Sequence, residues 1–150
     1  MKILLDTNVV LDVLLARQPF MQDSLDAMKK TINEGHILYL SASAVTDVFY
    51  ILRKATGSKT DAISHLRNLL SIVSVAEVNE SCILNALSSK MKDYEDAVAD
   101  ETAVFSSIDL ILTRNIRRTS CLVWFIQETG LRGWSLQVRR NQGSMMVCSM

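Results

Sequence analysis

The chain has 150 residues, 49% of them hydrophobic, with only five glycines and one proline. This composition excludes a disordered, collagen-like or low-complexity protein, and the length suits one domain with a real hydrophobic core. Sixteen basic residues balance sixteen acidic ones, so the net charge by itself indicates no class of partner.

The charges are nevertheless distributed unevenly along the chain. Residues 1–112 carry ten Lys or Arg against fifteen Asp or Glu, whereas residues 113–150 carry six Arg against Glu128 alone. An acidic body binds nucleic acid only where cations neutralise it, and a basic tail can supply phosphate contacts. The alternative is that the tail arginines are simply solvated.

Targeting signals and cysteine spacing indicate the compartment. No apolar run approaches the ~20 residues that cross a bilayer, and Asp6 interrupts the first apolar stretch too early for a secretory signal. We therefore expect a cytoplasmic protein with no membrane attachment. Cys82, Cys121 and Cys148 are odd in number and far apart, which predicts free thiols.

Short apolar runs alternate with amphipathic segments from the first residues onward. The first strand is predicted at residues 3–5, and Thr7 or Asn8 is expected to cap a helix that continues over residues 9–15. Further helices are predicted at residues 21–33, from Ser41 or Ser43 to Gly57, and at residues 61–70, 80–88 and 93–105. Further strands are predicted at residues 37–40, 72–75 and 110–112, with a fifth, edge strand at residues 122–126.

This alternation predicts an α/β domain with a parallel sheet covered by helices on both faces. In such sheets ligands bind at the carboxyl ends of the strands. The periodic pattern is lost from residue 130 onward. We therefore expect one domain over residues 1–129, followed by a divergent basic tail at residues 130–150, with disorder as one expected state.

Several acidic residues stand where such a sheet would bind a ligand. Asp6 follows the first strand, Asp47 lies one turn into a helix, and Asp93, Asp96 and Asp100 recur on one helical face. Clustered carboxylates repel one another unless a cation joins them, and oxygen ligands suit Mg²⁺. Taken singly, each acid is also explained as a turn, ion-pair or helix-dipole residue.

Four segments together resemble a known family. The segments ILLDTNVVLDVLL, SASAVTDVFYILRK, DYEDAVADETA and ILTRNI, in this order and spacing, resemble the PIN domain, in the branch of bacterial toxin-type ribonucleases. The resemblance covers roughly residues 1–117. It implies a three-layer α/β/α fold with a central parallel sheet of four to five strands. It also implies an endoribonuclease that depends on Mg²⁺ or Mn²⁺, often the toxin of a toxin–antitoxin pair.

The resemblance also assigns roles to residues. It makes Asp6, Asp47 and Asp96 the catalytic metal ligands, with Glu95 as a further ligand, and the metal-assisted hydrolysis of RNA then needs no covalent nucleophile. The residues expected to bind the RNA are Thr7, Asn8, Thr113, Arg114 and Asn115, of which Arg114 is a candidate phosphate contact. An antitoxin protein is an expected partner.

The chain departs from the family pattern after ILTRNI. The family there usually has an Asp-Phe pair, whereas Arg118 occupies the acidic position, and the usual P-E-E-F ending is missing. We hypothesise that the last ~33 residues are divergent or derive from a shifted reading frame, which sequencing of the gene would decide. Trp124, Phe125 and Trp134 are left without an assigned place, and we expect them to drive homodimer formation.

Three hypotheses of function follow. The leading one is a metal-dependent ribonuclease, and the alternative is a catalytically weakened PIN protein that binds RNA or a partner protein without cleavage. The third, a phosphotransfer receiver domain, requires an acidic pair after the first strand, a central acceptor Asp and a late Lys, and none of these is in place.

Overall fold

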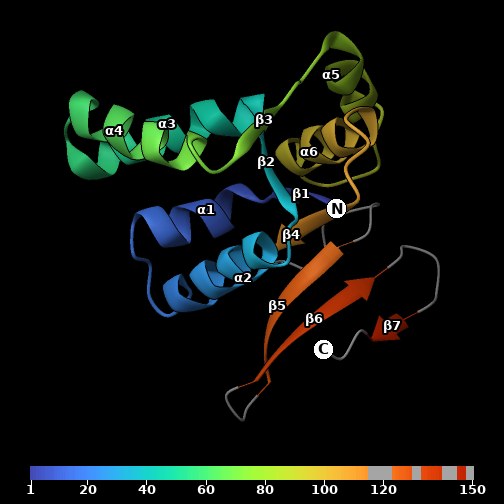
Figure 1. Ribbon diagram of the computed structural model, residues 1–150. Coiled ribbons are helices and arrows are strands. Elements are labelled where there is room, and N and C mark those ends of the chain that lie inside the picture. The colour runs from blue at the N-terminus through green and yellow to red at the C-terminus, as the bar shows by residue number, and fades with distance from the viewer. Residues whose placement is uncertain (115–122, 130–132, 140–144, 148–150) are drawn as a thin grey trace.

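The protein folds around a seven-stranded sheet in a computed structural model (Figure 1). The structure describes residues 1–114, 123–129, 133–139 and 145–147, and it describes side-chain burial within the first of these ranges. The strands are β1 (Lys2–Leu5), β2 (Ile37–Ser41), β3 (Ser74–Ala76), β4 (Leu110–Thr113), β5 (Val123–Thr129), β6 (Gly133–Arg139) and β7 (Met145–Val147).

In space the strands follow the order β3-β2-β1-β4-β5-β6-β7. The five strands from β3 to β5 run parallel, while β6 and β7 are antiparallel to their neighbours. The predicted α/β fold with a parallel sheet of four to five strands is therefore confirmed. The expectation that the fifth strand forms the edge was wrong, because β6 pairs with its outer side. The domain boundary near residue 129 stays a prediction.

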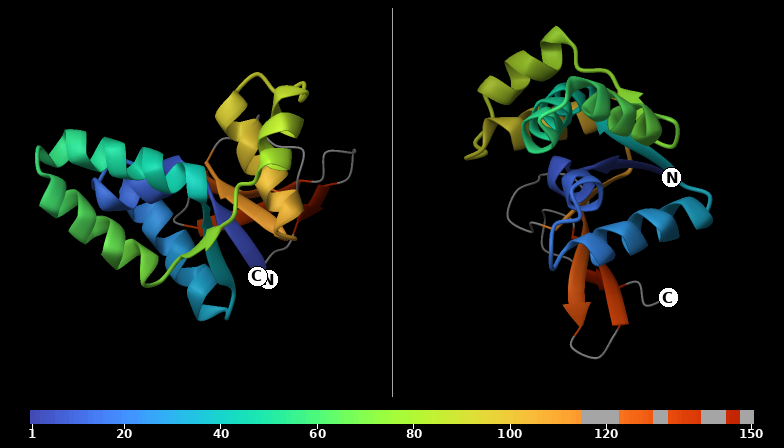
Figure 2. Two further views of the ribbon diagram at one scale, coloured as in Figure 1. Left: turned by 90° about the horizontal axis from the view of Figure 1, so that it is seen from above. Right: turned by 90° about the vertical axis from the view of Figure 1, so that its left-hand side faces the viewer.

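Helices cover both faces of the parallel sheet, which gives the three layers. One face carries α1 (Thr7–Leu14), α2 (Met21–Asn33), α3 (Ala42–Thr56) and α4 (Lys59–Leu70), and the other carries α5 (Glu80–Leu87) and α6 (Tyr94–Phe105), as the left view of Figure 2 shows. The chain steps from β1 to β2 to β3 in one direction and then back to β4. Right-handed crossovers put the helices of opposite steps on opposite faces.

Successive residues of the central strand enter two different cores. Ile3 and Leu5 pack into a cluster with residues of α1 to α4, whereas Leu4 packs with Ala103 of α6 and Ile111 of β4. All three β1 side chains are at most 2% exposed. Burial on both faces explains why the parallel strands appear in the sequence as continuous apolar runs.

Element ends follow local sequence signals, and hydrogen bonds explain two of the differences from the prediction. Asp6, and not Thr7 or Asn8, caps α1. β3 begins at Ser74, later than the predicted residue 72, because the Val73 N–H still donates to the Leu69 carbonyl and prolongs the last turn of α4. Both differences reflect hydrogen bonds that composition does not show.

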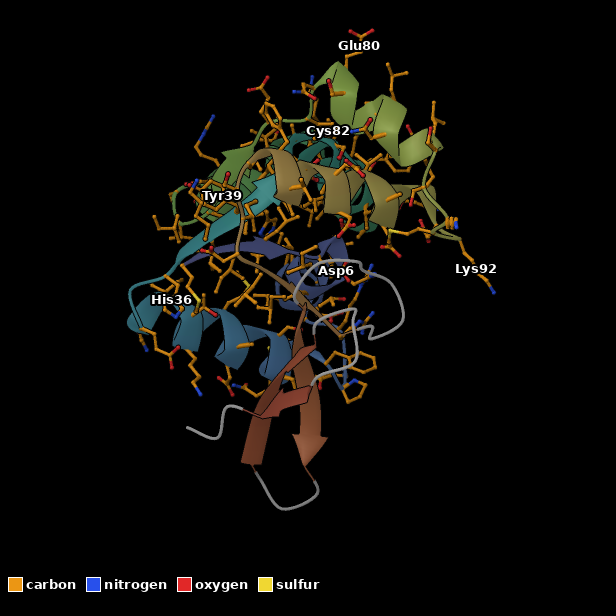
Figure 3. All side chains as sticks on the ribbon, turned by 90° about the vertical axis from the view of Figure 1, so that its right-hand side faces the viewer. Asp6, His36, Tyr39, Glu80, Cys82 and Lys92 are labelled. Atoms are coloured by element: carbon orange, nitrogen blue, oxygen red, sulfur yellow. The ribbon has the colours of Figure 1, made fainter. Side chains whose placement is uncertain are left out.

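The thiol prediction concerns three cysteines. Cys82 is a free, buried thiol on the side of α5 that faces α6, as Figure 3 shows. Its Sγ lies 3.7 Å from the Glu101 carbonyl oxygen. Cys121 and Cys148 lie outside the described residues.

Candidate active site

Asp6 stands at the carboxyl end of β1, the strand between β2 and β4. Its backbone is extended, so its Oδ1 reaches the backbone N–H of Asn8 at 3.0 Å and caps α1. Its Oδ2 accepts the hydroxyl of Thr113 at 2.5 Å, because the parallel register of β1 and β4 ends the two strands side by side. Both oxygens are thereby oriented, and each keeps a lone pair for a further partner.

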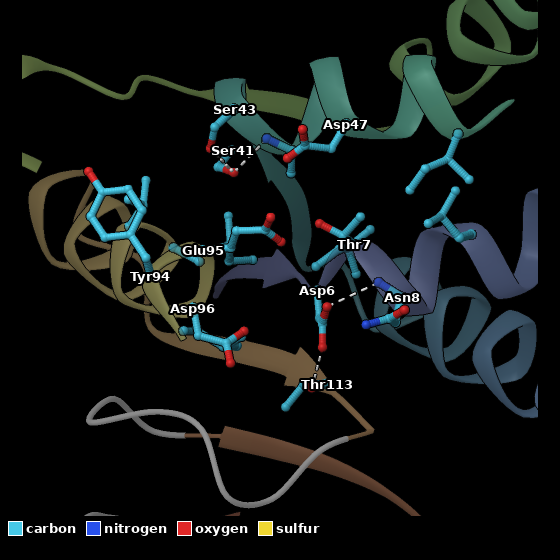
Figure 4. A pocket seen from close by; sticks show the side chains of 18 of the residues that line it. Asp6, Thr7, Asn8, Ser41, Ser43, Asp47, Tyr94, Glu95, Asp96 and Thr113 are labelled. Carbon is cyan, nitrogen blue, oxygen red and sulfur yellow. Dashed lines mark hydrogen bonds between the residues drawn. The ribbon is translucent and has the colours of Figure 1, made fainter. Parts of the chain in front are cut away.

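Asp47 reaches the same edge of the sheet from α3, which begins directly after β2. Ser41 starts this helix by accepting the backbone N–H of Ala44 at 3.2 Å, and the hydroxyls of Ser41 and Ser43 lie 3.1 Å apart. Asp47 follows one turn later and is exposed, with its carboxylate turned toward the space beside Asp6 (Figure 4).

Glu95 and Asp96 arrive on the first turn of α6, from the opposite face of the sheet. Asp93 caps this helix by accepting the Glu95 N–H at 3.0 Å. Asp93, Asp96 and Asp100, which were predicted to share one helical face, therefore have three different surroundings. Asp96 lines the cavity described below together with Glu95, whereas Asp93 serves the helix end and Asp100 is buried, with 5% of its surface exposed.

These carboxylates line one open cavity of about 530 Å³. Figure 4 shows the carboxylates of Asp47, Glu95 and Asp96 turned toward the space in front of Asp6. The predicted residues that line this cavity are Asp6, Thr7, Asn8, Asp47, Glu95, Asp96 and Thr113. The cavity is further lined by polar side chains that the sequence analysis did not select, namely Arg17, Ser41, Ser43, Tyr50 and Tyr94.

The donor set suits a hard divalent cation. Four carboxylates from three segments supply only oxygen, the ligand that Mg²⁺ and Mn²⁺ prefer. Within residues 1–114 and the three later strands, no group of three or more His, Cys, Asp or Glu is placed closely enough to share one metal ion. Mg²⁺ is often held by only one or two carboxylates, with waters and substrate phosphates completing its shell, and the cavity fits this mode of binding.

Arg114, predicted as a phosphate contact, packs beside the cavity. Its Nη1 lies 3.3 Å from Oδ2 of Asp12, and its guanidinium lies 4.2 Å from the centre of the Phe20 ring. Ser24 donates a hydrogen bond to the same Asp12 oxygen at 3.2 Å. Arg114 does not belong to the described residues that line the cavity. Asn115 lies outside the described residues.

Asp12 itself was missed by the sequence analysis. It is fully buried on α1, and its Oδ1 has no hydrogen-bond partner among the described residues. Burial raises the pKa of its carboxyl group, while the Arg114 guanidinium and the Ser24 hydrogen bond lower it. The available signal was an acid in the middle of the apolar stretch Val9–Leu15, because a buried acid requires a partner.

The PIN domain model matches residues 2–117, which is most of the chain and includes every candidate ligand. The chain belongs to the PIN domain family. The part of this PIN domain that follows residue 117, with the departure at Arg118, lies beyond the matched range.

Three proteins from bacteria are similar to this PIN domain. "Ribonuclease VapC1" of Aquifex aeolicus (strain VF5) is 26% identical over 119 residues, covering 76% of this chain and 81% of the relative. Two crystal structures share the fold. VapBC2 from Rickettsia felis, bound to a DNA fragment from its promoter, has a TM-score of 0.61 at 16% identity and covers 78% of this chain and 90% of its own. VapC20 of Mycobacterium tuberculosis, described as a Sarcin-Ricin loop cleaving toxin, has a TM-score of 0.57 at 14% identity, with 73% and 86% covered.

The helices of this PIN domain can be compared with the length and apolar character of a membrane-spanning helix. Among the helices of the described residues, none combines the length and the apolar character required to cross a bilayer.

Proposed function

We propose that this PIN-domain protein is an endoribonuclease that requires Mg²⁺ or Mn²⁺ and hydrolyses phosphodiester bonds in the cavity between β1, α3 and α6. The observation that carries the proposal is the convergence of Asp6, Asp47, Glu95 and Asp96 on one cavity, although these residues come from three distant segments of the chain. The name "Ribonuclease VapC1" of the Aquifex aeolicus relative supports it, as does the description of the M. tuberculosis protein as a Sarcin-Ricin loop cleaving toxin.

Electrostatics explains why such a cavity favours a metal ion. Four carboxylates that face one space repel each other, and an RNA phosphate adds a further negative charge. A bound divalent cation would offset this repulsion, polarise the phosphodiester and lower the pKa of a water molecule. We assign Asp6, Asp47 and Asp96 as the catalytic ligands and Glu95 as an additional ligand.

The protein's own residues orient these ligands. Thr113 and the Asn8 backbone hold the two oxygens of Asp6 in fixed directions, so the first ligand is preorganised before any ion binds. We propose that Thr7, Asn8 and Thr113 contact the RNA at the cavity wall. Arg114 and Asn115 complete the proposed RNA contacts, and Arg114 would have to exchange its contact with Asp12 for a phosphate.

We further propose that the protein acts as the toxin of a toxin–antitoxin pair in the cytoplasm, with an antitoxin protein as its partner. The support is that the chain shares its fold with the VapBC2 complex of Rickettsia felis. A homodimer is also part of the proposal. Sedimentation at high micromolar concentration tests it, and a purely monomeric protein would exclude the dimer.

A second candidate is a PIN protein that binds RNA or a partner protein but does not cut. Two observations favour it. Arg118 occupies a position where the family usually has an acid, and the described residues provide no group of three acids around one ion. In this case the carboxylate cavity would bind a cation and RNA without hydrolysis.

One experiment separates the two candidates. Purified protein is incubated with a mixed RNA pool, with Mn²⁺ or with EDTA, beside the variants Asp6→Asn and Asp96→Asn. Asp61→Asn is the matched control, since this exposed acid lies on the first turn of α4 and does not line the cavity. Cleavage that requires Mn²⁺, survives in the control and is lost in both cavity variants supports the nuclease. Binding of Mn²⁺ and RNA without cleavage by the wild-type protein supports the second candidate.

A further inference from the structure

Arg17 differs in charge from the other described residues that line the carboxylate cavity. Among the described residues that line the carboxylate cavity, it is the one basic side chain. It is half-buried, and no carboxylate of the described residues lies within 4.0 Å of its guanidinium. A cation thus stands at the wall of an acidic cavity without a close partner in the described chain.

The backbone that places Arg17 is strained. α1 ends in a Schellman motif, in which the N–H of Arg17 donates to the Asp12 carbonyl at 2.9 Å and the N–H of Ala16 donates to the Val13 carbonyl at 3.4 Å. The motif requires a left-handed residue, and Ala16 adopts it with φ of 49°. Glycine is the usual residue here, because a left-handed residue with a Cβ costs about 1–2 kcal/mol. Strain of this kind concentrates at functional sites.

The neighbouring carboxylate of Asp12 does not engage the Arg17 guanidinium, which therefore stays available to bind a ligand. Arg17 acts electrostatically on the buried Asp12, but Arg114 and Ser24 already contact the Oδ2 of that carboxylate. Arg17 acts on Asp12 through its electric field, since its charge lowers the pKa of that carboxyl group without direct contact. Asp12 therefore attracts Arg17 toward the wall of the cavity while Arg114 satisfies the carboxylate.

We propose that Arg17 binds a non-bridging phosphate oxygen of the RNA substrate in the carboxylate cavity, an inference that rests on the proposed nuclease function. A guanidinium presents donors in a planar fork that matches two phosphate oxygens. The proposed metal ligands are all anionic. A fixed cation at the cavity wall offsets part of their negative charge and thereby favours entry of the RNA backbone. Arg17 is thus a substrate-binding residue that Asp12 and the left-handed Ala16 position.

The test measures how RNA binding depends on salt. A labelled single-stranded oligoribonucleotide is titrated in Mn²⁺ with full-length protein carrying Asp6→Asn, which the proposed function expects to prevent cleavage. Arg17→Gln, Arg17→Lys and the control Arg53→Gln are added to this background, and Arg53 suits the control because it is exposed on α3 and does not line the cavity. Each phosphate contact to a single strand contributes about 0.7 to the slope of log K against log salt. We expect Arg17→Gln to reduce the slope by about 0.7, while Arg17→Lys and Arg53→Gln leave it unchanged.

Cleavage kinetics, measured without the Asp6 substitution, give a second readout. Loss of one donor to the reacting phosphate typically lowers kcat by about 10²-fold, so Arg17→Gln is expected to show a loss of that order. Arg17→Lys retains the charge but not the fork and is expected to lose part of the activity. Thermal unfolding verifies that both variants are folded. If Arg17→Gln does not fold, the expected partial loss of cleavage by folded Arg17→Lys is the deciding measurement.

The outcomes distinguish this inference from the proposed function. An unchanged salt slope together with unchanged cleavage in folded Arg17 variants would overturn the role of Arg17 while the nuclease stands. A wild-type protein that neither binds nor cuts RNA in Mn²⁺ would overturn the proposed function, and the inference with it.

Discussion

Replacing Thr113 by Val tests whether the first metal ligand is held in place before an ion binds. The substitution keeps the β-branched shape that suits β4 and removes the hydroxyl that Asp6 Oδ2 accepts at 2.5 Å. Thr113 is 3% exposed, so water does not readily replace the lost donor. Asp6 would keep the Asn8 backbone N–H as its remaining fixed donor in the described hydrogen bonds.

The magnitude follows from the charge of the acceptor. A hydrogen bond to an ionised group contributes about 1.5–3 kcal/mol, against about 0.5–1.5 kcal/mol for a neutral one. For a chain of this length, the larger contribution corresponds to a fall in Tm of about 3–12 °C. Urea unfolding at pH 7 measures the free energy of unfolding, and Mn²⁺-dependent RNA cleavage measures the effect on the site. We expect cleavage to fall because Asp6 loses its fixed orientation.

Thr102→Val is the matched control. Thr102 is also a fully buried threonine, and its hydroxyl donates at 2.6 Å to the neutral carbonyl of Val98 within α6. We expect a smaller loss of stability there and unchanged cleavage. Equal losses of stability in the two variants, or full cleavage by Thr113→Val, would refute the view that this threonine anchors the carboxylate.

Three further outcomes are expected. Because burial raises the pKa of Asp12, the folded state holds this proton more tightly than the unfolded state does. The free energy of unfolding of the wild type, relative to that of Asp12→Asn, should therefore be greatest below the ordinary pKa of 3.8. It should fall as pH rises through the raised pKa, by up to about 1.4 kcal/mol per pH unit. Urea unfolding measures this difference, and a difference independent of pH would contradict the expectation. Ala16→Gly should raise the free energy of unfolding by up to about 1 kcal/mol, since glycine adopts the φ of 49° without strain, and a lower Tm would argue against strain at this turn. Gly57→Ala should lower it by about 1 kcal/mol, because φ is 69° although open space surrounds the position of an added Cβ, and unchanged denaturant midpoints would count against the left-handed cap.

Local signals in the sequence determined most of the elements. Apolar runs at β1, β2 and β4 indicated strands buried on both faces, and Ser41 and Gly57 marked the start and end of α3. These features depend on hydrogen bonds and side-chain burial within a few residues, so composition and spacing reveal them. Position alone pointed to Asp6, Asp47 and Asp96 as acids that a cation could join, and the family resemblance added Glu95 and assigned each acid its role.

Only the tertiary structure decided which side chains meet. Asp6 and Thr113 are 107 residues apart in the chain, and they form a hydrogen bond because β1 and β4 are parallel neighbours whose carboxyl ends coincide. The pairing of Asp12 with Arg114 has the same origin, since it depends on where α1 packs against the end of β4. The sequence determined helices, strands and their caps because those are local, whereas the parallel register brought distant charges into contact and thereby fixed the partners in the site.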